Sequence, residues 1–291
     1  MLCLIGAYFW SEPFRVSALV WSGRAQGCSL EKALAAGRDQ TDQEAVKNRV
    51  LAASKIVEQD AGLLHYTTPL GDYWIPEKSK YSLFWNLAEM ERRIYGAGQN
   101  AVKTGDVVLD CGANVGTFAR LALKDGAAKV IAIEPAPENL ECLRRGFVKE
   151  IADGRLVLYP KGVWHKDDML MMNVDPGNSA ADSFVLQQKD AKPSAVKLPL
   201  TTIDKLVAEL ALDRVDFIKM DIEGAETNAL RGARETIKRF RPRMSLSTYH
   251  LPADAKDVPA IVASIRPEYI VESGPCAELP GALRPDILYF K

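Results

Sequence analysis

The sequence predicts an α/β fold with a mostly parallel β-sheet, and three features of the chain from about residue 102 onward indicate it. Short apolar segments recur, and most are followed by a segment with the apolar spacing of a helix. The apolar segments are nearly continuous, as expected for strands buried on both faces. The last one, 286–291, has no helix of its own before it, which predicts an antiparallel final strand.

The elements follow one another regularly in this part of the chain. The predicted strands are 106–110, 128–135, 155–160, 215–224, 241–250, 268–273 and 286–291. The predicted helices are 114–124 with Asn114 as N-cap, 137–150 with Pro137 in its first turn, 225–240 and 255–265. The interval 161–202 is less regular and contains DPGNSAADS, which predicts a functional loop.

Residues 1–100 are predicted to form a helical and hairpin extension ahead of a main domain at 101–291. The extension is expected to contain a helix over 29–60, a hairpin over 63–76 and a helix over 82–96 that Gly96 closes. It would serve as a cap over the acceptor side or as a dimerisation surface, so a homodimer is one expectation. The apolar residues 1–10 are too few to span a bilayer and follow no basic segment. A buried or oligomer-forming segment is favoured there over membrane contact through residues 1–22.

Composition narrows the class of partner. The 291 residues include 37 basic and 38 acidic side chains and no long block of one charge, which disfavours nucleic acid as an obligate partner. The five cysteines are far apart, odd in number and form no CxxC motif. This argues against a disulfide framework and a structural zinc site, and it favours a reducing, cytoplasmic location.

The turn DCGANVG follows the first predicted strand, at the sheet edge where open α/β proteins bind ligands. Gly112 would let the backbone approach a ligand, and Gly116 would let the next helix pack on the sheet. The third glycine of a dinucleotide motif is missing, and Asp110 would repel a pyrophosphate but attract a cationic amino-acid group. Glu134, at the end of the second strand, is placed to accept ribose hydroxyls. Together these residues fit S-adenosylmethionine better than a dinucleotide.

Five segments resemble, in order and spacing, the FkbM family of S-adenosylmethionine-dependent methyltransferases over about 102–250. They are VVLDCGANVGTFA, IAIEPAPENLECLRR, LTTIDKLV, VDFIKMDIEGAETNALRGA and MSLSTYH. The resemblance implies a class I, Rossmann-like methyltransferase fold with a seven-stranded sheet, and usually methyl transfer to a hydroxyl oxygen of a small molecule or sugar. By position it implies that Asp110, Gly112, Asn114 and Gly116 surround the methionine part of the cofactor, Glu134 its ribose, and Gly162, Val163 and Trp164 its adenine.

Three residues at the carboxyl edge of the predicted sheet are candidates for the chemistry. Asp221 ends the fourth strand, Glu223 follows it, and His250 ends the fifth. A hydroxyl acceptor benefits from a base, and each of these residues can act as one. The acids can instead stabilise a helix N-terminus, and an isolated histidine is often structural. The three side chains also offer hard ligands, but their spacing does not require a cation, and no metal is predicted.

Two other functions are also compatible with the sequence. A nicotinamide-dependent oxidoreductase uses a similar sheet, although the missing third glycine argues against it. A non-catalytic partner protein could keep the fold and even the cofactor without turnover.

Overall fold

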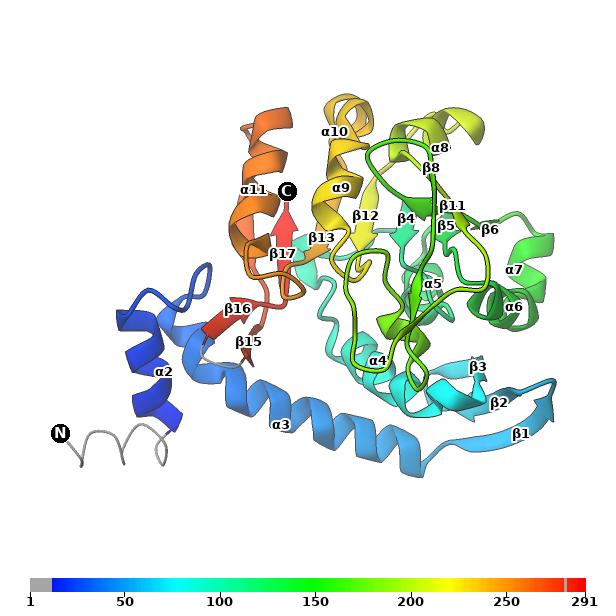
Figure 1. Cartoon of the computed structure of the whole chain (residues 1–291), viewed down its shortest axis with the longest axis horizontal. Helices are drawn as coiled ribbons and strands as arrows, with labels where there is room; N and C mark the ends of the chain where they lie inside the picture. The colour runs from blue at the N-terminus through cyan, green and yellow to red at the C-terminus, as the bar shows by residue number, and fades with distance from the viewer. Residues whose placement is uncertain (1–11, 280–281) are drawn as a thin grey trace.

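The computed structural model describes residues 12–279 and 282–291, and its centre is a seven-stranded sheet with the order β14-β17-β13-β12-β4-β5-β6 (Figure 1). The strands are β4 (Val107–Cys111), β5 (Lys129–Ile133), β6 (Leu156–Tyr159), β12 (Phe217–Met220), β13 (Arg243–Ser247), β14 (Val271–Ser273) and β17 (Ile287–Phe290). Strands β4, β5, β6, β12 and β13 pair in parallel, whereas β17 is antiparallel to both of its neighbours. The predicted fold class is confirmed. The antiparallel strand lies one position inside the sheet, because β14 forms the edge.

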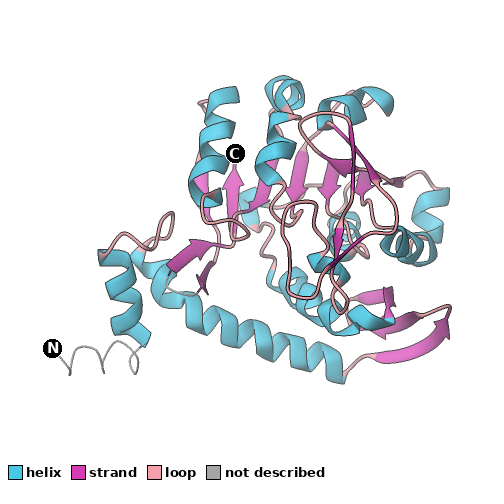
Figure 2. Cartoon of the chain, in the orientation of Figure 1, coloured by secondary structure: helices cyan, strands magenta, loops and turns pink. Residues whose placement is uncertain are grey.

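Helices cover both faces of this sheet (Figure 2). Alternate residues of a strand point to opposite faces, so Leu109 packs with the helices of one layer and Val108 with those of the other. The first layer contains α8 (Ile203–Glu209), α9 (Glu226–Arg231), α10 (Arg234–Phe240) and α11 (Asp254–Ile265). The second contains α4 (Lys80–Arg92), α5 (Thr117–Lys124), α6 (Pro137–Gly146) and α7 (Val148–Ala152).

Two predicted helices are each divided into two shorter ones. The helix expected over 137–150 is α6 and α7, separated at Phe147, whose side chain is buried against the second layer. The helix expected over 225–240 is α9 and α10. Periodicity alone did not reveal these breaks, because the apolar residues on both sides keep helical spacing.

The N-terminal region contains the predicted hairpin and a shorter helix than expected. Its elements are α2 (Glu12–Trp21), α3 (Leu30–Ala52), β1 (Lys55–Asp60), β2 (Leu63–Thr68) and β3 (Gly71–Pro76). The expectation of a helix over 29–60 is wrong for its last residues, because β1 pairs with β2 and completes a three-stranded sheet. Helix α4 ends at Arg92, and the C-cap residue Arg93 adopts a left-handed conformation, so the prediction that Gly96 closes this helix is wrong.

This region packs against the α5 and α6 side of the main sheet. Leu64, Ile75 and Leu83 share a buried apolar cluster with Val115 and Cys142 of the sheet domain. The guanidinium of Arg120 donates to the carbonyls of Asp72 and Gly146, each at 2.8 Å. The N-terminal region and the sheet domain therefore share part of one apolar core.

A disulfide links the N-terminal region to the C-terminal hairpin. Cys28, which precedes α3, is bonded to Cys276 at the start of β15 (Cys276–Leu279), which forms a hairpin with β16 (Ala282–Pro285). The argument against disulfides from cysteine spacing was therefore wrong, because 248 residues of sequence separate partners that folding brings together. The inference of a reducing compartment loses that support. Cys111 and Cys142 are buried free thiols.

Residues 1–22 include the apolar N-terminal segment for which membrane contact was the less favoured expectation. Residues 1–11 lie outside the described residues. Among the residues that are described, no helix combines the length and the apolar character needed to cross a bilayer.

Candidate functional site

The turn between β4 and α5 is shaped by left-handed backbone conformations at Gly112 (φ 78°), Asn114 (φ 49°) and Gly116 (φ 87°). A Cβ on Gly112 would lie 1.9 Å from the carbonyl oxygen of Asp221, so the turn lies directly against the end of β12. Helix α5 begins at Thr117 with Gly116 in the N-cap position. The prediction of Asn114 as N-cap is therefore wrong, and its side chain is free for another role.

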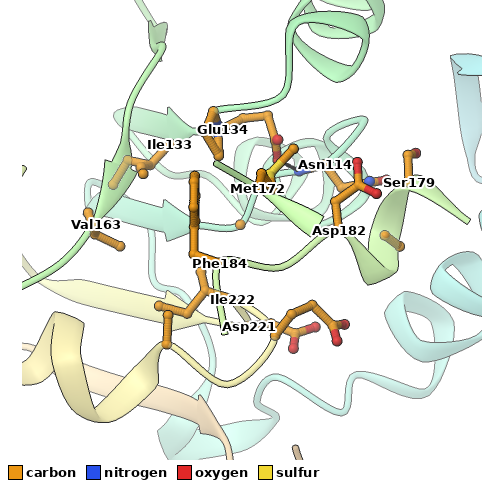
Figure 3. A pocket seen from close by; sticks show the side chains of 16 residues that line it. Asn114, Ile133, Glu134, Val163, Met172, Ser179, Asp182, Phe184, Asp221 and Ile222 are labelled. Carbon is orange, nitrogen blue, oxygen red and sulfur yellow. Dashed lines mark hydrogen bonds between the residues drawn. The ribbon is translucent and has the colours of Figure 1, made fainter. Parts of the chain in front are cut away.

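The turn borders a cavity that opens at the carboxyl edge of the sheet (Figure 3). Ile133, Val163, Phe184 and Ile222 gather toward one end of it, and Asn114, Ser179, Asp182 and Asp221 toward the other. The cavity therefore has an apolar and a polar end.

Five of the eight predicted cofactor residues line this cavity: Gly112, Asn114, Glu134, Gly162 and Val163. The other three do not. Gly116 faces α6, since a Cβ there would lie 2.4 Å from the Phe147 ring. Trp164 donates its backbone N–H to the carbonyl of Thr201 at 2.7 Å, and it is not among the lining residues. Asp110 is fully buried beneath the turn.

Glu134 is held in place by backbone donors. Its carboxylate accepts the N–H of Asn114 at 2.8 Å and that of Ala136 at 2.9 Å. Burial raises the pKa of Glu134 to about 7, against the lowering effect of these hydrogen bonds. The backbone thus fixes the position of a carboxylate that is poised between its two protonation states near neutral pH.

Asp110 is paired with a buried lysine that sequence reasoning missed. Lys219 Nζ lies 3.4 Å from Asp110 Oδ1 and donates to the carbonyl of Gly112 at 2.8 Å. The charge of Asp110 is therefore offset inside the protein and does not face the cavity as expected. The available signal was a lysine within the otherwise apolar strand FIKM.

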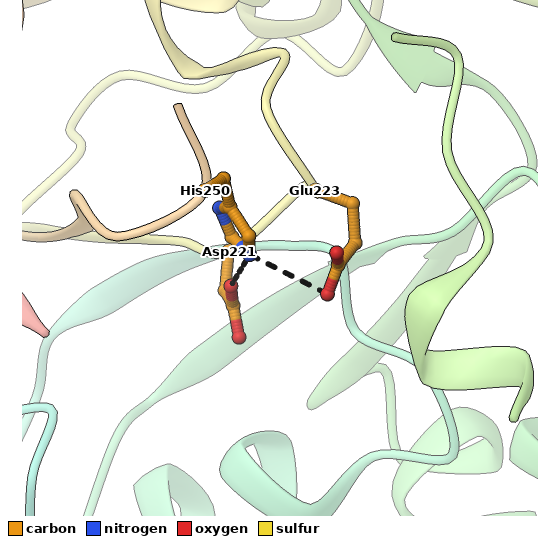
Figure 4. A group of neighbouring side chains, drawn as sticks. All are labelled: Asp221, Glu223 and His250. Carbon is orange, nitrogen blue, oxygen red and sulfur yellow. Dashed lines mark ion pairs between the residues drawn. The ribbon is translucent and has the colours of Figure 1, made fainter. Parts of the chain in front are cut away.

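The three predicted catalytic side chains meet at the carboxyl ends of β12 and β13 (Figure 4). His250 Nε2 lies 3.4 Å from Asp221 Oδ1 and 3.4 Å from Glu223 Oε1. On the other side of the ring, His250 Nδ1 lies 3.0 Å from Glu226 Oε1. The His250 side chain is only 2% exposed. The predicted convergence at this edge is present, and Glu226 is an additional member.

Electrostatics in this cluster bear on the role of His250. Burial lowers the pKa of the imidazole, but the nearby carboxylates of Glu223, Glu226 and Asp221 outweigh burial and raise it well above its usual value. These carboxylates therefore favour the protonated form of the ring. This disfavours the hypothesis that His250 acts as a free base.

A second, more polar cavity adjoins the first. The two share Gly112, Asn114, Ala180, Asp221 and Glu223, and the lining of the second also includes Asn86, Glu89, Tyr95, Lys219 and Tyr249. The hydroxyl of Tyr95 donates to Asp221 Oδ2 at 2.7 Å. The carboxylate cluster thus lies at the junction of two cavities.

The loop predicted within 161–202 lies over the first cavity and supplies Met172, Ser179, Asp182 and Phe184 to its lining. Its path is set by short-range bonds: Asp175 Oδ1 accepts the N–H of Gly177 at 2.8 Å, and Asn178 Oδ1 that of Ala180 at 3.1 Å. The sequence predicted a functional loop in this interval but did not place it at the site or identify its lining residues. Turn-forming Asp and Asn residues in DPGNSAADS were the only local signal.

Comparison with known proteins places the chain in a family. Residues 110–269 match the model of the methyltransferase FkbM domain, and this interval is more than half of the chain. The 31-O-demethyl-FK506 methyltransferase FkbM of Streptomyces tacrolimicus is 24% identical over 160 residues, covering 46% of this chain and 62% of that protein. The crystal structure of methyltransferase FkbM from Methylobacillus flagellatus KT superposes with a TM-score of 0.50 and 20% identity, over 87% of this chain and 59% of that one. The chain thus spans about three fifths of the length of each relative. It belongs to the FkbM methyltransferase family.

Proposed function

We propose that this protein is an S-adenosylmethionine-dependent methyltransferase that methylates a hydroxyl oxygen of a small molecule or sugar. The observation that carries the proposal is the position of Asn114. Its side-chain amide is buried and lines both cavities, yet neither polar atom has a hydrogen-bond partner among the described residues. Buried polar groups are nearly always hydrogen-bonded, so the amide needs a polar ligand at the turn.

The cavity lining fits the three parts of that cofactor. Ile133, Val163 and Phe184 offer an apolar site for the adenine ring. Glu134 retains some acceptor capacity for a ribose hydroxyl, since a carboxylate has about four acceptor positions, the backbone takes two of them and Asn139 Nδ2 a third. The methionine part would then extend along Gly112 and Asn114 toward Asp221. Its sulfonium carries the methyl group to be displaced.

The acceptor would bind in the second cavity with its hydroxyl at Asp221 and Glu223. In-line displacement needs mainly alignment and exclusion of water, and the loop carrying Phe184 and Asp182 covers the cofactor side. The acceptor oxygen loses its proton to a carboxylate of the cluster and forms the new bond to the methyl carbon. Asp221 Oδ1 is suited to this, because it is buried and has no hydrogen-bond partner within the described chain.

Calorimetry with S-adenosylhomocysteine and NAD⁺, followed by a screen of hydroxylated compounds with methyl-labelled cofactor, tests the proposal. We expect S-adenosylhomocysteine to bind, NAD⁺ not to bind, and label to move to a hydroxyl oxygen of the acceptor. Binding of NAD⁺ alone would support the oxidoreductase alternative. Cofactor binding without label transfer to any hydroxylated compound would support a non-catalytic role.

A further inference from the structure

We propose that Asp221, Glu223 and His250 bind a divalent metal cation at the junction of the two cavities. This deepens the proposed function, on which its catalytic part rests, and it departs from the expectation of no metal drawn from the sequence. One ligand atom from each residue lies within 4.8 Å of the others. In an octahedral site with bonds of about 2.1 Å, neighbouring ligand atoms lie about 3 Å apart. The separations of 3.4 Å from His250 Nε2 to each carboxylate need only a small closure to reach that geometry.

The histidine provides the observation that points to a missing ligand. Its side chain is 98% buried, being only 2% exposed, and Nε2 faces the two carboxylates without a hydrogen bond to any described residue. Asp221 Oδ1 is likewise without a hydrogen-bond partner in the part of the chain that is described. These two buried atoms lie 3.4 Å apart without a hydrogen bond between them, and an ion bound to both would satisfy them.

The surroundings have the supporting contacts of a metal site. Glu226 Oε1 lies 3.0 Å from His250 Nδ1 and also accepts the N–H of Ile222 at 3.0 Å. A carboxylate in this position holds a proton on Nδ1 and leaves the lone pair of Nε2 for the metal. The hydroxyl of Tyr95 donates a hydrogen bond to the other oxygen of Asp221 and so holds that carboxylate in place. Both ligands are thus oriented by partners of their own.

Charge also favours a cation. Three carboxylates (Asp221, Glu223 and Glu226) surround one imidazole, and the nearby Lys219 is already paired with Asp110. A second acidic group, formed by Glu226, His250 and Asp254, lies on the Nδ1 side of the ring. There Asp254 accepts the N–H of Leu251 at 2.7 Å, and Nδ1 is occupied by Glu226. The open side of the ring is therefore the side of Asp221 and Glu223.

Three protein ligands leave positions of an octahedral ion for water and for the acceptor hydroxyl. A hydroxyl bound to the ion loses its proton more easily, as water does on a catalytic metal. With Asp221 Oδ1 bound to the ion, the proton passes instead to the free oxygen of Glu223. The acceptor oxygen bonds to the methyl carbon, and the electron pair of the broken carbon–sulfur bond stays on sulfur. The acceptor class is therefore a compound whose hydroxyl can reach the ion from the second cavity.

Electron paramagnetic resonance with Mn²⁺ tests the site on the full chain after treatment with EDTA. We expect one Mn²⁺ per chain, and affinity lowered at least about tenfold in Glu223→Gln and in Asp221→Asn, which keep side-chain size. Asp254→Asn is the matched control and should keep affinity within about twofold. Circular dichroism would verify that each variant folds.

Failure to bind Mn²⁺, equal binding by the two ligand variants, or loss of binding only in Asp254→Asn would overturn the site. Label transfer that persists in EDTA would remove its catalytic role and leave the methyltransferase proposal standing. Mn²⁺ binding with no label transfer would leave the metal site standing and remove the proposed function.

Discussion

The two halves of the candidate site are positioned by different means. The half proposed to bind the cofactor is set by the backbone: left-handed residues at 112–116 form the turn, and two N–H groups fix Glu134. The half proposed to bind the acceptor is set by side chains from two strand ends, where Asp221, Glu223 and Glu226 surround His250. Backbone geometry is dictated locally by residue type, whereas a side-chain cluster depends on the whole sheet. Function should therefore be most sensitive to changes of shape in the proposed cofactor half and to changes of charge in the proposed acceptor half.

The largest expected effect is a change of shape at the turn. Gly112→Ala would place a Cβ 1.9 Å from the carbonyl oxygen of Asp221 at a left-handed residue. We expect the free energy of unfolding to fall by about 3 kcal/mol and cofactor binding to be lost. Urea denaturation and calorimetry would measure both.

Gly154→Ala is the matched control, because Gly154 is also left-handed (φ +69°) but has nothing within 4 Å of a built Cβ. It should cost only about 1 kcal/mol, from the backbone conformation alone. An equal loss of stability in the two variants would show that the left-handed conformation of Gly112, and not its close approach to β12, requires glycine there.

The next effect is a change of charge at the acceptor half. Asp221→Asn keeps the shape of the side chain and removes the carboxylate nearest the proposed acceptor hydroxyl. We expect kcat to fall about a hundredfold or more, with cofactor affinity changed little. Tyr95→Phe removes only the hydrogen bond to Asp221 Oδ2 and should lower kcat by about fivefold. Turnover of labelled cofactor would rank the variants, and wild-type turnover in Asp221→Asn would exclude the assigned role.

A smaller effect is expected at Glu134, in the half of the site proposed to bind the cofactor. Glu134→Gln should weaken S-adenosylhomocysteine by about thirtyfold, because hydrogen bonds to a charged acceptor are worth about 2 kcal/mol more than none. Glu138→Gln, in the first turn of α6 and paired with Lys78, is the control and should bind normally. Unchanged affinity in Glu134→Gln would remove the ribose assignment.

The same carboxylate predicts a pH dependence. Burial raises the pKa of Glu134 from 4.5 to about 7, so the folded chain binds this proton more tightly than the unfolded chain. Its contribution to stability is present below about pH 4.5 and is lost as the pH rises through about 7. Ribose hydroxyls favour the ionised form, so cofactor affinity should instead rise about tenfold between about pH 6 and pH 8. Glu134→Gln should flatten both dependences in calorimetry and urea denaturation; a slope that persists would assign it to another group.

Much of the fold could be predicted because it depends on local patterns. Buried strands such as 107–111 and 217–220 are short, mostly apolar runs, and the turn between β4 and α5 contains glycines at two of its left-handed positions. Helix limits were less predictable. Arg93, which takes a left-handed conformation without being glycine, and Phe147, whose burial separates α6 from α7, carry no signal in their neighbours.

What the sequence alone determined about this protein is the alternation of main-sheet strands with helices, the family to which it belongs and the strand ends at which its acids and His250 converge. These follow from residue type and spacing, which act over a few residues. The tertiary structure decided which charges are compensated and which remain open. Lys219 on β12 pairs with Asp110 on β4, and Cys28 is bonded to Cys276. His250 places Nδ1 against Glu226 and Nε2 against Asp221. Such contacts join residues far apart in the chain, and burial gives them their strength, so they exist only once the sheet has formed.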